Sequence, residues 1–175
     1  MIIERKPKYQ GYLNVDEITY RTKSGKEGKR ELMVRKNAVA ALLYDTVKEK
    51  YILISQWRPG SASDILEVVA GTLDKPGEDP QDAMIREIEE EVGYATDSIK
   101  LIDECYTSPG GSSEIITIYF CEVSKKIGEG GGVPGELEEI DTIEMDRDEL
   151  LSTRFKDAKT IIAVNWARYN HNINS

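Results

Sequence analysis

The segment at residues 80–92 constrains the fold most, because it carries start and stop signals for a single helix. Proline at position 80 suits the first turn of a helix, Asp79 is a natural N-cap, and Gly93 can end the helix. Between these limits, apolar residues recur at helical spacing: Met84, Ile85, Ile88 and Val92. Such a stripe can pack on a sheet. The sequence therefore predicts one helix against a β-sheet near the middle of the chain.

Strand-like segments lie on both sides of this helix. Runs rich in β-forming residues occur at 9–21, 32–35, 38–44, 51–56, 65–70, 99–106, 115–123 and 140–145. Two more helices are predicted near 147–152 and 157–169. This order predicts an α+β fold, an α/β/α sandwich with a mixed sheet. We expect residues 1–36 to form an N-terminal β-hairpin region, followed by a second domain at 37–175.

The composition limits the partners of the chain. Its net charge is −9, whereas nonspecific nucleic-acid binding needs clustered lysines and arginines. No apolar run approaches the roughly 18–20 residues of a membrane span, and the first residues do not resemble a secretory signal. We therefore expect a cytoplasmic protein without nucleic-acid or membrane partners. Cys105 and Cys121 are expected to be buried reduced thiols, since a pair of cysteines and one histidine, His171, cannot complete a zinc site.

Three glutamates share one face of the predicted helix. At roughly 100° per residue, Glu87, Glu90 and Glu91 fall within an arc of about 100°, while Glu89 points away. Like charges at this spacing repel by a few tenths of a kcal/mol per pair, and a cation between them would reverse the sign. Hard oxygen ligands suit Mg²⁺ or Mn²⁺. Taken without context, the three glutamates also fit an ordinary solvated acidic face.

The wider pattern closely resembles the Nudix box, written G-x5-E-x7-R-E-U-x-E-E-x-G-U with U aliphatic. The matching residues are Gly71, Glu78, Arg86, Glu87, Ile88, Glu90, Glu91 and Gly93. The chain departs from the box at two points. Six residues rather than five separate Gly71 from Glu78, and Tyr94 replaces the final aliphatic residue. We expect the extra residue to enlarge the turn at Lys75-Pro76 and to leave Glu78 in place.

The resemblance implies a role for each residue of the box. The implied metal ligands are Glu87, Glu90, Glu91 and the main-chain carbonyl of Ala70, with Glu90 also a catalytic candidate. Arg86 and Glu78 would pair and orient the helix carboxylates. The implied chemistry is attack of water on one phosphorus of a pyrophosphate, with Mg²⁺ or Mn²⁺ as cofactor.

Three further segments look like those of Nudix enzymes that act on nucleotide sugars: 108–110 (Ser-Pro-Gly), 130–132 (Gly-Gly-Gly) and 157–160 (Asp-Ala-Lys-Thr). The resemblance implies that residues 37–175 are the Nudix hydrolase domain. The candidate substrate-binding residues are Arg35, Arg58, Pro109 and Glu114. A surface arginine is the alternative for Arg58, and a simple Pro-Gly turn for Pro109. The implied reaction splits a nucleoside diphosphate sugar of the GDP-mannose, UDP-sugar or ADP-ribose type into nucleoside monophosphate and sugar phosphate. The alternative function is a non-catalytic sensing module with the same fold.

Two features point to a catalytic loop and to a dimer. The glycine-rich stretch at residues 128–135 is predicted to be a mobile loop, and two glutamates follow it. Our hypothesis is that Glu139, or failing that Glu138, positions or deprotonates the attacking water; two solvated loop glutamates are the alternative. Related nucleotide-sugar hydrolases place their N-terminal element against a second subunit, so the resemblance implies a homodimer; packing of this element on its own domain is the alternative. Arg30 or Arg35 could then approach the partner's active site.

Overall fold

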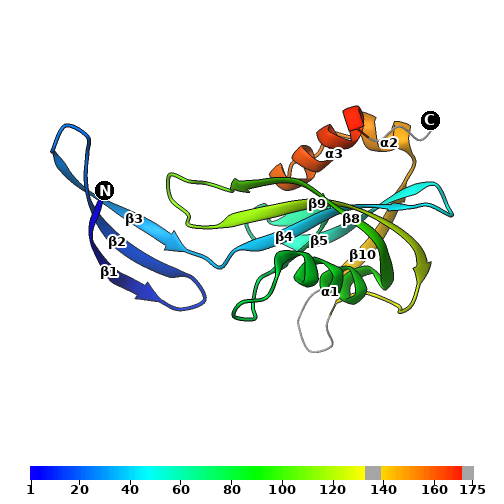
Figure 1. The fold of residues 1–175 in the computed structure, drawn as a ribbon, viewed down its shortest axis with the longest axis horizontal. Helices are drawn as coiled ribbons and strands as arrows, with labels where there is room; N and C mark the ends of the chain where they lie inside the picture. Colours follow the sequence, from blue (N-terminus) through cyan, green and yellow to red (C-terminus); the bar gives the residue numbers. More distant parts are fainter. Residues whose placement is uncertain (133–138, 171–175) are drawn as a thin grey trace. The chain divides into compact units, whose positions relative to one another are not determined.

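The computed structural model describes residues 1–132 and 139–170. They fall into two compact units (Figure 1). Unit 1 joins Met1–Asn37 to Cys105–Ile116, and unit 2 joins Ala38–Glu104 to Thr117–Ser175. Unit 1 therefore includes a segment from the second half of the sequence as well as the N-terminal region.

Unit 1 is built on an antiparallel sheet in the order β1-β2-β3, drawn in blue in Figure 1. Its strands are β1 (Ile2–Gln10), β2 (Asn14–Arg21) and β3 (Glu27–Val34). The predicted hairpin is present as β2 and β3, but its first strand begins at residue 14 and not at 9. Residues 9 and 10 instead end β1, a strand that the sequence did not predict. Every residue of β1 is exposed, so the strand lacks the alternation of buried and exposed positions that marks most strands. Pro7 fits this place, because an edge strand tolerates a missing N–H group.

The second segment of unit 1 pairs with the end of β3. Met33 N–H donates to the carbonyl of Gly111 over 2.8 Å, and Ser113 N–H donates to the carbonyl of Met33 over 3.0 Å. Arg35 N–H then donates to Ser113 Oγ over 2.9 Å. These main-chain bonds explain why the predicted region 1–36 and the observed unit 1 differ in extent.

Unit 2 is an α+β sandwich, as predicted. Its sheet has the order β10-β5-β4-β9-β8, with β6 paired to β5 and β7 to β4. The elements are β4 (Ala38–Asp45), β5 (Lys50–Arg58), β6 (Ser63–Glu67), β7 (Val69–Thr72), α1 (Pro80–Val92), β8 (Tyr94–Tyr106), β9 (Ile115–Lys126), β10 (Ile140–Met145), α2 (Arg147–Ser152) and α3 (Ala158–Asn170). Strands β8 and β9 continue into unit 1 at one end. Helices α1 and α3 both contact β4 and lie on opposite sides of the strands (Figure 1).

The single strand predicted at residues 65–70 is wrong, because the structure divides it into β6 and β7. Val68, between them, donates its N–H to Thr160 Oγ1 on α3 over 2.9 Å instead of to a neighbouring strand. The chain thereby passes from one partner strand to another. Propensity alone could not reveal this break, since every residue from 65 to 70 except Glu67 is aliphatic.

The apolar stripe of α1 packs on the sheet, as predicted. Met84, Ile88 and Val92 are fully buried, while Ile85 is only half-buried. Met84, Ile88 and Val92 join a core formed mainly by residues of β4, β5, β7 and β9: Val39, Ala41, Leu43, Ile52, Ile54, Val69, Tyr119, Cys121 and Val123. This packing fixes α1 by one face and leaves its acidic face beside β7.

The two cysteines differ in burial. Cys121 is fully buried, and burial raises the pKa of its thiol to about 12. Cys105 is only half-buried, so the prediction of two buried thiols is wrong for this residue. Cys105 lies near the far end of β8, where that strand has left the core of unit 2. Within residues 1–132 and 139–170, no helix is long and apolar enough to cross a membrane.

Candidate active site

Helix α1 has the predicted limits, and both ends are capped as the sequence indicated. The Asp79 side chain accepts a hydrogen bond from Gln81 N–H over 2.8 Å. Gly93 has φ +73° and donates its N–H to the carbonyls of Ile88 and Glu89, each over 3.1 Å. These caps fix where the helix begins and ends, and so set which residues share its acidic face.

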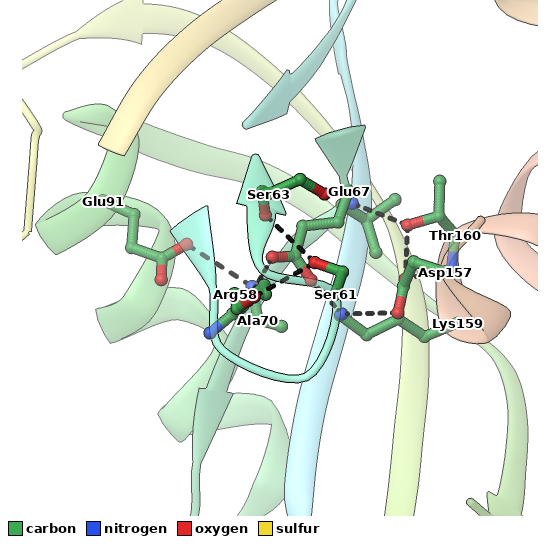
Figure 2. A network of polar contacts seen from close by, with 10 residues as sticks. Arg58, Ser61, Ser63, Glu67, Ala70, Glu91, Asp157, Lys159 and Thr160 are labelled. Atoms are coloured by element: carbon green, nitrogen blue, oxygen red, sulfur yellow. Dashed lines mark hydrogen bonds and ion pairs between the residues drawn. The ribbon is translucent and has the colours of Figure 1, made fainter. Parts of the chain in front are cut away.

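The glycine of the box lies directly under a glutamate of α1. A Cβ atom on Gly71 would come within 2.0 Å of the Glu87 carboxyl carbon. Glu87 therefore occupies the space that any other residue at position 71 would fill. The neighbouring Ala70 donates its N–H to Glu91 Oε2 over 3.4 Å, as Figure 2 shows. The main chain at residues 70–71 of β7 thus meets two of the three candidate ligands.

Arg86 lies among the carboxylates of the box. Its Nη1 is 2.8 Å from Glu87 Oε1 and 2.8 Å from Glu90 Oε2, and its Nε is 3.4 Å from Glu78 Oε1. Burial lowers the pKa of Arg86, but its hydrogen bond to Glu78 and the charges of Glu87 and Glu90 outweigh burial and raise it. The guanidinium therefore stays charged and holds the side chains of two candidate ligands.

The one-residue insertion leaves Glu78 within reach of Arg86, as we expected. Glu78 N–H donates to the carbonyl of Lys75 over 3.2 Å, which closes the enlarged turn. Lys75 Nζ also lies 3.5 Å from Glu78 Oε1. The other oxygen of this carboxylate, Glu78 Oε2, is buried and has no hydrogen-bond partner. A buried polar atom without a partner is unusual in a folded protein. This oxygen of Glu78 can therefore accept a further hydrogen bond at the site.

The acidic face fits a divalent cation in donor type and in charge. Burial raises the pKa of the Glu87 carboxyl; Arg86 opposes this shift, and Glu90 and Asp74 add to it. A nearby cation would favour the ionised form of the same group. Carboxylates and a main-chain carbonyl are ligands that Mg²⁺ prefers. Across the described part of the chain, however, no three acidic, histidine or cysteine residues are already gathered as a metal cluster. Arg86 instead pairs with Glu87 and Glu90, so metal binding would require these carboxylates to turn from it.

A second group of charges surrounds the strand that leads to Ala70 (Figure 2). Glu67 is 2% exposed, and its Oε1 lies 2.5 Å from Arg58 Nε. Its Oε2 is paired with Lys159, which also lies 3.1 Å from Asp157 Oδ1. Sequence reasoning missed Glu67. The signal was present, because a single carboxylate in the aliphatic run 65–70 requires buried partners.

Three of the four predicted substrate-binding residues lie in unit 1. Arg35 Nε is 2.9 Å from Glu114 Oε1, although the two residues are 79 positions apart in the sequence. Thr107 Oγ1 donates to the second oxygen of Glu114 over 2.8 Å. Pro109 lies in a turn that the N–H of Gly111 closes on the carbonyl of residue 108, over 3.1 Å. The fourth candidate, Arg58, lies in unit 2 with the box residues.

The described part of the glycine-rich stretch, residues 128–132, is irregular, as predicted, but it is bonded to the end of α1. Gly131 N–H donates to the carbonyl of Glu91 over 2.7 Å, and Gly132 N–H donates to the carbonyl of Glu90 over 3.1 Å. Gly128 N–H also donates to the carbonyl of Gly93 over 3.1 Å. These bonds satisfy carbonyls that a helix end leaves without partners.

Of the two glutamates in the catalytic hypothesis, Glu139 is among the residues that the structure describes. Glu139 is exposed immediately before β10. Glu138 lies outside the described residues.

Known proteins are similar in sequence to this chain along almost its whole length. Residues 34–164 match the NUDIX domain family. The chain is 35% identical to the methanol dehydrogenase activator of Bacillus methanolicus over 158 residues. This alignment covers 88% of this chain and 83% of that protein. It is 31% identical to the GDP-mannose pyrophosphatase of Escherichia coli (strain K12) over an alignment of 187 residues. That alignment covers 97% of this chain and 95% of that protein.

A solved structure shares the fold. An ADP compounds hydrolase matches with a TM-score of 0.78 at 22% identity, over 96% of this chain and 91% of that one. The family match covers most of the chain and includes the whole segment from Gly71 to Gly93. The chain therefore belongs to the Nudix family of hydrolases.

Proposed function

We propose that this chain hydrolyses the pyrophosphate bond of a nucleoside diphosphate sugar and releases a nucleoside monophosphate and a sugar phosphate. The observation that carries the proposal is the meeting of α1 with β7, where Glu87 covers Gly71 and Glu91 lies beside Ala70. The name of the Escherichia coli relative supports GDP-mannose among the candidate substrates. UDP-sugars remain candidates because the box loop resembles that of enzymes acting on UDP-sugars and GDP-mannose. ADP-ribose remains a candidate because Ser108-Pro109-Gly110 resembles an element of ADP-ribose and nucleotide-sugar hydrolases.

Residues of unit 2 would bind the metal, orient its ligands and contact the substrate. Glu87, Glu90, Glu91 and the carbonyl of Ala70 would hold Mg²⁺ or Mn²⁺. When bound, such a cation lowers the pKa of water and neutralises charge on the phosphate oxygens. Arg86 pairs with Glu87 and Glu90 in the metal-free chain, and Glu78 would keep it beside these carboxylates when they turn to the cation. Arg58 would contact a phosphate of the substrate.

The substrate can be identified with a panel of nucleotide sugars. Purified chain is incubated with GDP-mannose, UDP-glucose and ADP-ribose, with and without Mg²⁺, and phosphate is measured after adding a phosphatase. We expect phosphatase-dependent release from at least one compound, and only in the presence of Mg²⁺. Chelation with EDTA should abolish release, and added Mg²⁺ should restore it.

A second candidate is activation of a methanol dehydrogenase, the role stated by the name of the Bacillus methanolicus relative. The rate of a methanol dehydrogenase with and without the chain tests this role. Calorimetric binding of the same nucleotide sugars, measured beside the panel, separates a non-catalytic sensing role from hydrolysis. Binding of a nucleotide sugar without any cleavage, at every Mg²⁺ concentration, would overturn the proposed hydrolysis and favour sensing.

Replacement of Glu139 by glutamine tests the proposed base. If this residue deprotonates the attacking water, kcat should fall by about 10²–10⁴, the usual range for loss of a general base. Glu129→Gln provides the control, because Glu129 is also exposed and lies before Gly130, Gly131 and Gly132 in the same glycine-rich stretch. Glu138→Gln should be measured in parallel. A loss of less than about threefold in both variants would remove this segment from the mechanism.

We also propose that the chain is a homodimer. The support is the apolar surface of the N-terminal sheet and its turn, where Ile2 is 60% exposed, Tyr9 59% and Tyr12 99%. Burial of these exposed apolar side chains against a second copy would stabilise the sheet.

A further inference from the structure

We propose that Glu67 is a positioning residue that holds Arg58 in the orientation required to contact the diphosphate of the substrate, with Lys159 supplying its second partner. The inference rests on the proposed function. It adds a carboxylate from β6 and a lysine from α3 to the residues on which the reaction depends.

The burial of Glu67 is the first argument. This side chain is 2% exposed, yet both of its oxygens pair with cations, Oε1 with Arg58 and Oε2 with Lys159. Taking a carboxylate out of water costs several kcal/mol, and a buried ion pair often stabilises a fold no better than apolar residues of similar volume. Stability alone is therefore a weak reason for Glu67, and placement of its partners is a better one.

The geometry of Arg58 is the second argument. Arg58 ends β5, and Glu67 ends β6, the strand paired with it. The carboxylate binds Arg58 through Nε, on one edge of the planar guanidinium. A contact through Nε restricts rotation of the whole plane, and a plane of fixed orientation suits the paired oxygens of a phosphate. The side chain of Arg58 is 38% exposed, so it is not sealed inside the core.

The anchoring of Glu67 is the third argument. Lys159 is also paired with Asp157, whose Oδ2 accepts from Thr160 N–H over 3.0 Å and from Thr160 Oγ1 over 2.7 Å. Thr160 Oγ1 in turn accepts from Val68 N–H over 2.9 Å. The start of α3 is thereby bonded both to the side chain of Glu67 and to the main chain of the next residue. Figure 2 shows this closed set of contacts and, three residues beyond Glu67, the bond from Ala70 to Glu91.

The charges of the group balance. Two carboxylates, Glu67 and Asp157, face two cations, Arg58 and Lys159. Removing the charge of Glu67 takes away the carboxylate that Arg58 and Lys159 share. Lys159 keeps its pair with Asp157, whereas Arg58 loses the contact through Nε that orients it. The predicted defect is therefore in substrate handling, with the ligands on α1 intact.

The test is the kinetics of Glu67→Gln with the nucleotide sugar that the panel identifies. We expect kcat/KM to fall on the order of 10- to 100-fold, the range for loss of a hydrogen bond to a charged group. The calorimetric affinity for Mg²⁺ without substrate should stay within about twofold, since the four proposed ligands are unchanged. Glu144→Gln provides the control. Glu144 lies on β10 of the same unit, and its carboxylate is 2.5 Å from Lys48 Nζ, so this substitution also removes a carboxylate from an ion pair. Its kinetics should equal those of the unchanged chain.

A double-mutant cycle decides whether Glu67 acts through Arg58. Arg58→Lys keeps the charge but loses Nε, and the partly exposed position should tolerate it without unfolding. If Glu67 acts through Arg58, each single variant lowers kcat/KM, and the double variant is no worse than the poorer single one. Additive losses, or an unchanged kcat/KM in Arg58→Lys, would overturn the inference. If the chain without substitutions cleaves no nucleotide sugar, the proposed function itself is refuted. Failure of the proposed function is therefore distinguishable from failure of the inference about Glu67.

Discussion

Replacing Glu91 or Glu87 with glutamine should lower Mg²⁺-dependent turnover by more than about 100-fold, because changing even an outer partner of metal ligands costs about 10–100-fold. Both residues lie against β7: Glu91 is 6% exposed beside Ala70, and Glu87 covers Gly71. Glutamine keeps the size of either side chain but removes the negative charge that would bind the cation. We expect the defect in kcat and in Mg²⁺ affinity, measured by steady-state kinetics and calorimetry.

The fold should survive both substitutions. Burial raises the pKa of the Glu87 carboxyl, so the metal-free protein gains little from keeping this group ionised. Relief of repulsion along the helix also favours the neutral variants by a few tenths of a kcal/mol per pair. Glu89→Gln is the matched control, since Glu89 is exposed on the other face of α1. If Glu91→Gln and Glu87→Gln both retain near-normal Mg²⁺-dependent turnover, the metal site is wrongly assigned.

Local signals were sufficient to predict helix α1. Asp79, Pro80 and Gly93 fixed its limits, and its apolar stripe identified the face that packs on the sheet. Strand β10 was also predicted with its observed bounds. Long-range pairing decided the remaining elements. β1 is a strand only because β2 lies beside it, and the run at 65–70 divides because Val68 bonds to α3. Sequence propensity carries no information on either partner.

The candidate site shows the same division. The resemblance to the Nudix box predicted that Arg86 would meet Glu78 and the helix glutamates, and the contacts are present on one helix and the loop before it. The spacing did not predict that one guanidinium would pair with both Glu87 and Glu90. It also gave no sign that Glu67 and Lys159, 92 positions apart, form a buried pair. Such contacts depend on how α3 docks on the sheet, which a linear pattern does not contain.

Replacing Gly93 with alanine should cost about 2–5 kcal/mol in the free energy of unfolding. At φ +73°, a side chain at this position strains the backbone by about 1–2 kcal/mol. Its Cβ would also come within 2.2 Å of the Gly128 carbonyl oxygen, and overpacking of this kind typically adds about 1–3 kcal/mol. Since the obstructing atom is backbone, relief requires the glycine segment to move away from the end of α1.

Gly77→Ala separates these two contributions. Gly77 has φ +76°, in the same unit, but a Cβ there would meet nothing within 4 Å. It should therefore lose only the strain, about 1–2 kcal/mol. Urea unfolding followed by tryptophan fluorescence reports on the relevant part of the chain, because both tryptophans, Trp57 and Trp166, lie in unit 2. Equal losses in the two variants would show that contact with Gly128 contributes nothing. A larger loss for Gly93→Ala would show that the fold holds Gly128 against the end of α1 too firmly to make room for a Cβ atom.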